Sequence, residues 1–181
     1  MKQLVIDPEH SDLGFKIRHL MVSNVKGTLT DYSGGMKYSM DNMGDAEIRF
    51  EAEVKSISTG NADRDAHLNN EDFFNTERFP KMYFESTSVN IANGKVKGEM
   101  TIKDTTKEIE LDVEYNGQSV DPWGNTKYGW EITGVINRND FGLTWNAPLE
   151  AGGVLVSEEV KLNIDLQMME AEEDLVTESA Y

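Results

Sequence analysis

A strict alternation of apolar and polar side chains is the feature that most constrains how this chain folds. Between residues 46 and 55 every second side chain is apolar and each one between them is charged. Such a period of two is typical of a β-strand with one face buried and one face in water. Similar alternation recurs over residues 13–19, 82–91, 96–102, 109–115, 128–136 and 160–168. The sequence therefore predicts an all-β fold of about eight antiparallel strands.

The apolar faces of these strands have to be buried, and two architectures achieve this. A sandwich packs two sheets face to face, whereas a closed barrel buries one continuous face around its interior. The outer positions are almost uniformly charged, and several links between strands are short, so we expect an extended up-and-down antiparallel β-barrel. Gly34 and Gly35 are expected to form a turn or a bulge with positive φ, and the polar segments 116–119 and 121–125 are expected to form a longer loop between strands.

The segment 59–80 breaks the alternation and is the candidate helix of the chain. Ser58, Thr59 and Asn61 are suitable N-caps, and Asp63 and Asp65 follow where a helix dipole favours negative charge. Four apolar residues, Leu68, Phe73, Phe74 and Phe79, are spread through the rest of the segment. We expect one short helix that closes one end of the barrel.

Length and charge restrict the partners of the chain. Its 181 residues contain 33 acidic and 17 basic side chains, which gives a formal net charge of −16. That charge argues against nucleic acid and equally against an anionic membrane surface as a partner. No cysteine is present, and the N-terminus has no long apolar run, so we expect no stable membrane insertion and a cytoplasmic protein. We expect a single domain over residues 1–169 and an acidic tail over residues 170–181.

The chemistry-bearing residues do not form a recognised catalytic pattern. The three histidines, His10, His19 and His67, have no metal-ligand spacing, so we expect no metal and no catalytic site. We expect His10 and His67 to satisfy backbone groups in loops and His19 to end an apolar inner row. Arg64 and Asp65 are interpreted as a structural clamp on the helix rather than as an acid/base pair.

Four groups of residues together resemble the YceI-like family of polyisoprenoid-binding, lipocalin-like barrels. The resemblance covers roughly residues 5–168, and residues 102–106 depart from the family pattern at Asp104 and Thr105. The groups are residues 7–11 with Phe15, Arg18 and His19; residues 59–61 with 64–68; residues 72–74 with Phe79 and Pro80; and residues 137–142. Several ordered groups in one chain are far more specific than any one of them.

This resemblance implies a function that the composition alone leaves open, because a row of Phe and Met on inner strands is equally compatible with a packed core. It implies non-catalytic binding, transport or storage of a long apolar amphiphile, such as a polyisoprenoid, an isoprenoid quinone or a fatty-acyl chain, with no other cofactor. A homodimer is also expected by resemblance. The predicted ligand-binding residues are Phe15, Ile17, His19, Phe50, Phe74, Phe79, Met82, Phe84, Met100, Trp130, Ile132 and Phe141.

Two arginines, Arg18 and Arg138, are predicted contacts for the head group of such a ligand. Two other hypotheses remain at this stage. One is a small enzyme that acts on an isoprenoid or lipid chain with buried histidines. The other is a pure interaction protein, which would require an exposed apolar patch that the charged outer faces do not suggest.

Overall fold

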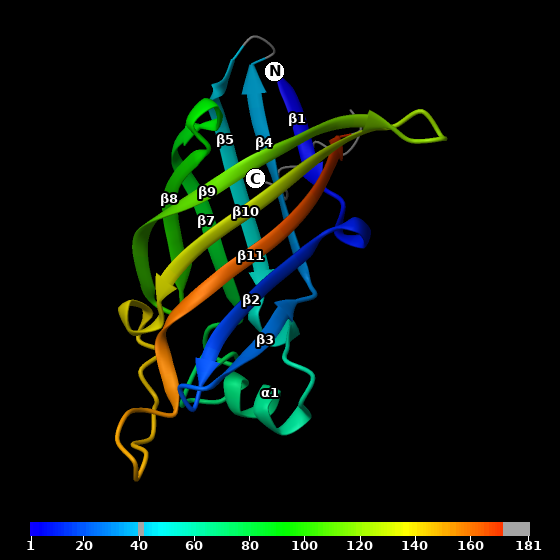
Figure 1. The fold of residues 1–181 in the computed structure, drawn as a ribbon. Helices are drawn as coiled ribbons and strands as arrows, with labels where there is room; N and C mark the ends of the chain where they lie inside the picture. The colour runs from blue at the N-terminus through cyan, green and yellow to red at the C-terminus, as the bar shows by residue number, and fades with distance from the viewer. Residues whose placement is uncertain (40–41, 172–181) are drawn as a thin grey trace.

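The alternating segments form antiparallel strands that close into a barrel in a computed structural model of the protein (Figure 1). The structure describes residues 1–39 and 42–171. Within these residues, the closed ring contains, in spatial order, β1 (Lys2–Ile6), β4 (Tyr32–Ser39), β5 (Asn42–Glu53), β7 (Lys81–Asn90), β8 (Lys95–Ile102), β9 (Thr105–Val120), β10 (Thr126–Asn137) and β11 (Val156–Glu170). Leu4 on β1 pairs with Met36 on β4 and with Glu170 on β11, which closes the ring. The predicted barrel is therefore confirmed.

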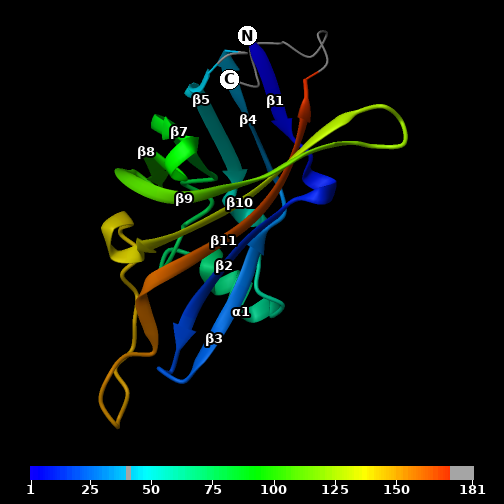
Figure 2. The same ribbon diagram turned by 45° about the horizontal axis from the view of Figure 1, so that its top comes forward.

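Three further strands lengthen the barrel at one end. They are β2 (Asp12–His19), β3 (Ser23–Leu29) and β6 (Ile57–Ser58). β1 and β2 follow one another along the same edge of β11, but β1 pairs on its other side with β4, whereas β2 pairs with β3. The 3-10 turn Pro8–His10 separates them, and the Asp7 side chain caps this turn. Figures 1 and 2 show β2, β3 and the helix at the same end, which we call the lower end.

The predicted helix is α1 (Ala62–Asn69), and it lies at the lower end as expected (Figure 1). Asn61 is its N-cap, and the Asn61 side chain accepts a hydrogen bond of 2.9 Å from the backbone N–H of Arg64. The helix is shorter than the segment 59–80 because the chain turns back after Asn70. The backbone N–H of Phe74 then donates to the carbonyl of Leu68 at 3.0 Å. The remaining short helical turns are Val54–Ser56, Ile91–Asn93 and Arg138–Phe141.

The turn or bulge predicted at Gly34–Gly35 and the first part of the predicted loop, residues 116–119, are wrong because these glycines lie inside strands, whereas residues 121–125 do form a loop. Gly35 lies within β4, where a Cβ atom would collide with the carbonyl oxygen of Leu4 on β1. This glycine permits close approach of two strands and needs no positive φ. Gly117 has a φ of 102° and lies in β9, which continues through the predicted loop 116–119 with a shift of register. Both errors come from glycines that have a role inside a sheet.

The predicted tail of residues 170–181 lies outside the described residues except for its first two members. Glu170 is the last residue of β11, and its carboxylate accepts hydrogen bonds from Lys2 Nζ at 2.8 Å and from the Tyr128 hydroxyl at 2.9 Å. The backbone N–H of Ala171 donates to the carbonyl of Gln3 at 3.0 Å. These two residues therefore belong to the upper end of the barrel.

Candidate functional site

The inner faces of the strands enclose two cavities that share part of their walls. The upper cavity has a volume of about 120 Å³ and the lower cavity about 290 Å³. A single water molecule needs roughly 10–15 Å³ on this scale, so neither space is an ordinary packing defect. Met100 and Leu162 line both cavities. The two cavities therefore lie next to each other, on either side of these two side chains.

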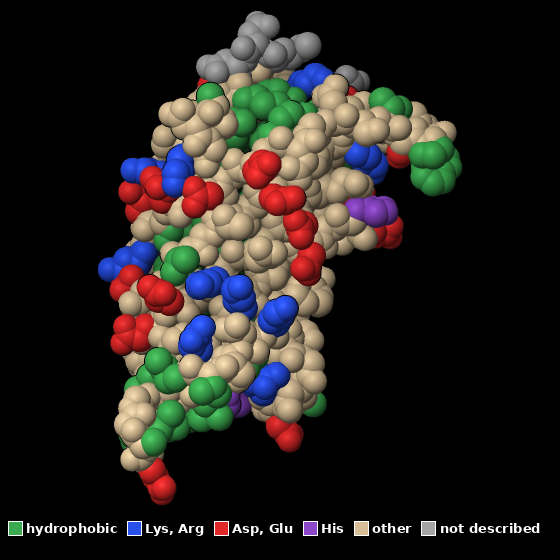
Figure 3. All heavy atoms as spheres, in the orientation of Figure 1, with side chains coloured by type: hydrophobic (Ala, Val, Ile, Leu, Met, Phe, Trp, Pro, Cys, Tyr) green, Lys and Arg blue, Asp and Glu red, His purple; other side chains and the backbone are tan. Residues whose placement is uncertain are grey.

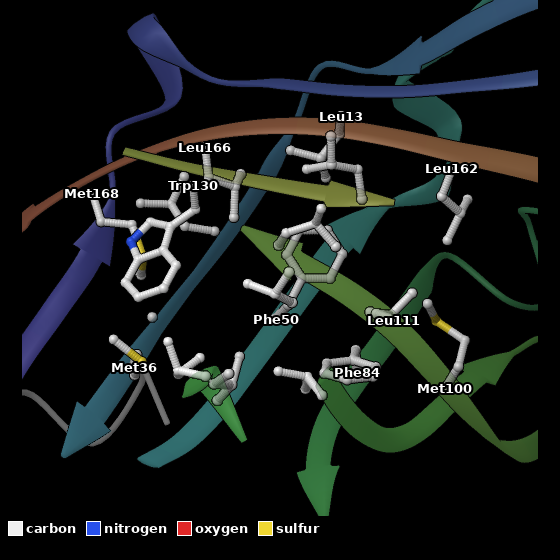
Figure 4. A pocket seen from close by; sticks show the side chains of 18 residues that line it. Leu13, Met36, Phe50, Phe84, Met100, Leu111, Trp130, Leu162, Leu166 and Met168 are labelled. Atoms are coloured by element: carbon white, nitrogen blue, oxygen red, sulfur yellow. The ribbon is translucent and has the colours of Figure 1, made fainter. Parts of the chain in front are cut away.

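The upper cavity is lined almost entirely by apolar side chains, which point toward one another from opposite sides of the barrel (Figure 4). Phe50, Phe84, Met100, Trp130 and Ile132, all predicted to bind the ligand, are among its lining residues. The remaining lining residues are Ile6, Leu13, Gly35, Met36, Ile48, Ile91, Val96, Leu111, Val113, Leu162, Ile164, Leu166 and Met168. Of all of them, Trp130 alone carries an N–H or O–H group on its side chain. The upper cavity therefore suits a hydrocarbon chain.

The Trp130 side chain is buried, with 5% of the residue exposed. Its indole N–H has no hydrogen-bond acceptor among the described residues. The ring packs against Tyr115, with 4.5 Å between ring centroids. A buried donor without an acceptor is uncommon in proteins. Trp130 is therefore a suitable spectroscopic reporter for anything that enters the upper cavity.

The lower cavity differs from the upper one because cationic and polar groups interrupt its apolar wall. Arg64, Arg138, His19, His67 and Thr59 line it, and no Asp or Glu among the described residues does. The apolar part of the wall includes the predicted residues Phe15, Ile17, Phe74, Met82 and Met100 together with Val25, Leu29, Ile57, Leu68, Phe73, Ile102, Ile136, Leu143, Trp145, Leu155, Val156, Val160 and Leu162. In a chain with a net charge of −16, this absence of carboxylates sets the lower cavity apart.

Arg138 is the most buried cation of this wall, with 3% of the residue exposed. Its guanidinium donates hydrogen bonds to the backbone carbonyls of Leu143 at 2.5 Å, Trp145 at 2.8 Å, Val156 at 3.3 Å and Ser157 at 2.8 Å. Burial lowers the pKa of Arg138, and the nearby charge of Glu158 opposes that change. Four of the five N–H groups of the guanidinium therefore have an acceptor within the described part of the chain, and one N–H remains.

Arg64 and Asp65 form the predicted structural clamp, and both hold Thr59. Arg64 Nε donates to the Thr59 hydroxyl oxygen at 2.7 Å, and a terminal nitrogen donates to the Thr59 carbonyl at 2.8 Å. The Asp65 carboxylate accepts from the Thr59 backbone N–H at 2.9 Å and from its hydroxyl at 2.6 Å. These contacts fix the start of α1 against β6, so Arg64 faces the lower cavity in one orientation.

The three histidines do not come together in one site. His67 packs edge-on against Phe73 and Trp145, with ring centroids 5.0 and 4.8 Å apart, and Nε2 lies 2.8 Å from an oxygen of Asp72. His10 lies elsewhere, 3.1 Å from Asp7, with a side chain that is 61% exposed. The prediction of backbone partners for His10 and His67 is therefore wrong, because both pair with carboxylates. His19 lines the lower cavity as predicted.

Three of the predicted contact residues lie outside both cavity walls. Phe141 is 1% exposed and belongs to a packed cluster with Val54 and Ala52. The Phe79 ring lies beneath the Arg78 guanidinium, and the Arg78 Cζ atom is 5.0 Å from the centroid of that ring. Arg18 is exposed on the outer face of β2. Conversely, Trp145 lines the lower cavity but lies in an irregular loop, where no strand alternation indicates an inward side chain.

Two further properties concern metals and membranes. Within residues 1–39 and 42–171, no group of three or more His, Asp or Glu side chains could hold a metal ion. In the same part of the chain, no helix has the length and apolar character that are needed to cross a bilayer.

The closed barrel and its lined interior define the class of a ligand-binding β-barrel protein. Comparison with known proteins then identifies the family. The chain belongs to the YceI-like domain family, whose sequence profile matches residues 4–168. A UPF0312 protein of Staphylococcus aureus is 40% identical over 162 residues, which cover 89% of this chain and 94% of the relative.

Solved structures show the same fold. The YCEI protein of Campylobacter jejuni is 33% identical, with a TM-score of 0.73, over 92% of this chain and 97% of that one. A polyisoprenoid binding domain from Saccharophagus degradans is 15% identical, with a TM-score of 0.66, over 94% of this chain and 100% of that one. At that identity the second likeness concerns the fold alone. Together with the family match, these structures confirm the YceI-like resemblance.

Proposed function

We propose that the protein binds one long amphiphile along both cavities, with the hydrocarbon chain in the upper cavity and an anionic head group in the lower one. The observation that carries this proposal is the difference in polarity between the two cavities. The upper wall is apolar, whereas the lower wall holds Arg64, Arg138, His19 and His67 without a carboxylate. A phosphate or carboxylate head fits such a wall because guanidinium groups bind these anions through charge-assisted hydrogen bonds.

The apolar cavity supplies the binding energy for the chain of this ligand. Each methylene group transferred from water contributes about 0.8 kcal/mol. Methionine side chains, here Met36, Met100 and Met168, adapt their shape to branched or straight chains. The candidate ligands with an anionic head are therefore a phosphorylated polyisoprenoid or a fatty-acyl lipid, whereas an isoprenoid quinone has a neutral head group and fits the two arginines less well. The name of the Saccharophagus degradans domain supports a polyisoprenoid. Transport or storage of such a lipid is the proposed role.

The predicted contacts divide between the two parts of this ligand. Phe50, Phe84, Trp130 and Ile132 would contact the distal chain, and Met100, which lines both cavities, would contact the chain between them. The remaining cavity-lining residues from the prediction, Phe15, Ile17, His19, Phe74 and Met82, would surround the part next to the head group. Arg138 would contribute its charge and its one remaining N–H. A homodimer and a cytoplasmic location both stay predictions.

Tryptophan fluorescence tests the two-cavity arrangement directly, because the three tryptophans occupy three environments. Trp130 lines the upper cavity, Trp145 lines the lower cavity, and Trp123 is 84% exposed. We compare a variant that retains only Trp130 with one that retains only Trp145, after lipid removal and titration with fatty acids of increasing length. A short fatty acid should change the Trp145 emission alone, and a long one should change both.

The matched control retains only Trp123 and should show no change with any ligand. A response of Trp123 equal to that of Trp130, or no response of any variant, would contradict the proposal. Mass spectrometry of the bound lipid after incubation separates binding from catalysis. The recovered lipid should be chemically unchanged, whereas conversion that is lost in His19→Ala or His67→Ala would instead support the enzyme hypothesis.

A further inference from the structure

We propose that the lower end of the barrel docks onto the surface of an anionic lipid bilayer. An exposed apolar rim and a row of lysines on the adjoining outer face carry this inference. Docking would serve to exchange the lipid ligand between the bilayer and the lower cavity. Only this purpose rests on the proposed function. The docking itself can be tested without any ligand.

The first element is the turn between β2 and β3, whose residues Leu20, Met21 and Val22 are 42%, 51% and 82% exposed. Tight turns between strands normally use Gly, Asn or Asp where φ is positive. Here Leu20 and Met21 adopt φ values of 53° and 62°, which are uncommon for bulky side chains. The chain therefore holds three apolar side chains in water despite unfavourable backbone geometry.

The second element is an exposed apolar residue, Val154, in the loop beside this turn. Val154 is 38% exposed, and the neighbouring Gly153 lies next to the Met21 side chain. The backbone N–H of Leu20 donates to the carbonyl of Leu155 at 2.8 Å, which ties the turn to the loop. We call Leu20, Met21, Val22 and Val154 the apolar rim. Because Leu155 lines the lower cavity, the rim adjoins the cavity wall. Figure 3 shows hydrophobic side chains gathered at this end.

The third element is a row of three lysines that crosses β11, β2 and β3 on their outer face. Lys161 is paired with Lys16, and Lys16 is paired with Lys26. Like charges directly opposite one another on a sheet destabilise it. None of these three lysines forms an ion pair within the described residues. Figure 3 shows basic side chains over this part of the molecule, and the exposed Arg18 follows Lys16 on the same face of β2.

The overall negative charge of the chain does not cancel the local positive charge of the lysine row. Asp12 and Asp165 lie on the same face but four residues away from the lysine row along their strands. That spacing is about 13 Å, which exceeds the screening length of about 8 Å at physiological ionic strength. Glu159 lies only two residues from Lys161 along β11, a spacing of about 7 Å, which is within the screening length. Glu150, Glu158 and the acidic residues Asp63 and Asp65 of α1 are further carboxylates at the lower end, so the lysines are opposed in part. Docking should therefore be reversible and sensitive to salt.

The apolar rim and the lysine row together match the surface of an anionic lipid bilayer. Shallow insertion of apolar side chains combined with attraction of Lys and Arg to anionic head groups is the usual basis of peripheral membrane binding. A tilt of the barrel would place the rim in the interface and the outer face of β2 and β3 against the head groups. Each lysine near such a surface changes the affinity about fivefold.

Flotation of the full chain with lipid vesicles tests the docking. The parent protein should bind vesicles of phosphatidylcholine mixed with phosphatidylglycerol, and should bind phosphatidylcholine alone much more weakly. The variant Lys26→Gln/Lys161→Gln should bind the anionic vesicles about 25-fold more weakly. The matched control Lys95→Gln/Lys97→Gln removes the same charge from β8, where both lysines pair with carboxylates, and should bind like the parent.

The apolar rim has its own variant and control. Met21→Ser/Val22→Ser should weaken vesicle binding, whereas Val120→Ser/Trp123→Ser removes equally exposed apolar groups near the β9–β10 turn and should not. Equal binding of the parent to both kinds of vesicle, or equal binding of parent and lysine variant, would overturn the proposal.

A second measurement separates docking from ligand binding. A fluorescent fatty acid is presented either in cyclodextrin or within anionic vesicles. Both docking variants should take up the probe from cyclodextrin as the parent does, but should take it up more slowly from vesicles. Unchanged vesicle rates would contradict the role in lipid exchange. Failure of the parent to take up the probe by either route would contradict the proposed function, while the flotation result would still decide the docking.

Discussion

Replacement of Arg138 by Gln should separate two contributions of this side chain, one to stability and one to ligand choice. Arg138 follows β10 and binds four backbone carbonyls of residues 143–157, which form the loop before β11 and the first two residues of that strand. This segment supplies Leu143, Trp145, Leu155 and Val156 to the lower cavity. The clamp therefore determines the position of one cavity wall.

The magnitude follows from the hydrogen bonds that Gln cannot replace. Three of the four are 2.8 Å or shorter, and the fourth, to Val156, is 3.3 Å. A hydrogen bond from a charged donor contributes roughly 1.5–3 kcal/mol. Water can reach some of the freed carbonyls, so we expect a loss of about 3–5 kcal/mol in the free energy of unfolding. This loss is a large part of the roughly 5–15 kcal/mol that stabilises a typical domain.

Urea unfolding of the lipid-free protein measures this loss, and hydrogen exchange locates it. Backbone amides of residues 143–157 should lose protection in Arg138→Gln, while those of β7 and β8 should not. The exposed Arg18→Gln is the control and should leave the free energy of unfolding within about 0.5 kcal/mol of the parent. A loss below about 1 kcal/mol in Arg138→Gln would refute the clamp argument.

Ligand choice is measured with a fatty acid and a fatty alcohol of equal length. Arg138→Gln should reduce the preference for the acid because the lower cavity loses a positive charge. Arg138→Lys retains the charge but cannot form the planar fork of hydrogen bonds. It should therefore keep the preference for the acid and still lose stability. Equal preference for the acid in all three proteins would contradict a head-group role for Arg138.

Two further perturbations have defined outcomes. Burial raises the pKa of the Asp7 carboxyl, but hydrogen bonds from Lys127, Gln167 and His10 outweigh burial and lower that pKa. Ionised Asp7 therefore stabilises the fold above the unfolded pKa of about 3.9, and its contribution is lost as the pH falls through the lower folded value. In urea unfolding, Asp7→Asn should cost about 2 kcal/mol near neutral pH and progressively less below pH ~4; a constant difference would contradict this. Gly98→Ala would place a Cβ atom 2.5 Å from the Glu85 carbonyl oxygen and against the Phe84 ring, so thermal unfolding should show a loss of about 2 kcal/mol. Gly129→Ala, with its nearest contact at 3.4 Å, is the control and should cost clearly less.

The strands of the barrel could be predicted because water forces their alternation. Each outer face meets solvent and each inner face meets the interior, so β5 and β9 carry the period of two in their sequences. The exchange of partners between β1 and β2 could not be predicted in this way. It depends on pairing with β11, more than 130 residues away in the chain, and on a short turn at Pro8–His10 that local patterns do not reveal.

The site could be predicted only in part, for a related reason. Alternation identifies which side chains of a strand face inward, and it placed Phe84 and Ile132 correctly on the inner face. It does not show whether inward side chains meet one another or enclose space, because that depends on the diameter of the closed ring. Phe141 and Phe84 have the same chemistry, yet Phe141 is packed in a cluster and Phe84 lines a cavity.

Net charge is a poor guide to the surface of this protein because the sheet register redistributes the charges. The total of −16 argues against an anionic membrane when it is treated as an average over the surface. Lys161 is far from Lys16 and Lys26 in the sequence, and only the pairing of β2 with β3 and with β11 brings the three into one row. Over distances longer than the screening length, the carboxylates on other faces have little effect on that row. The local charge beside the apolar rim therefore determines which surfaces the lower end can approach.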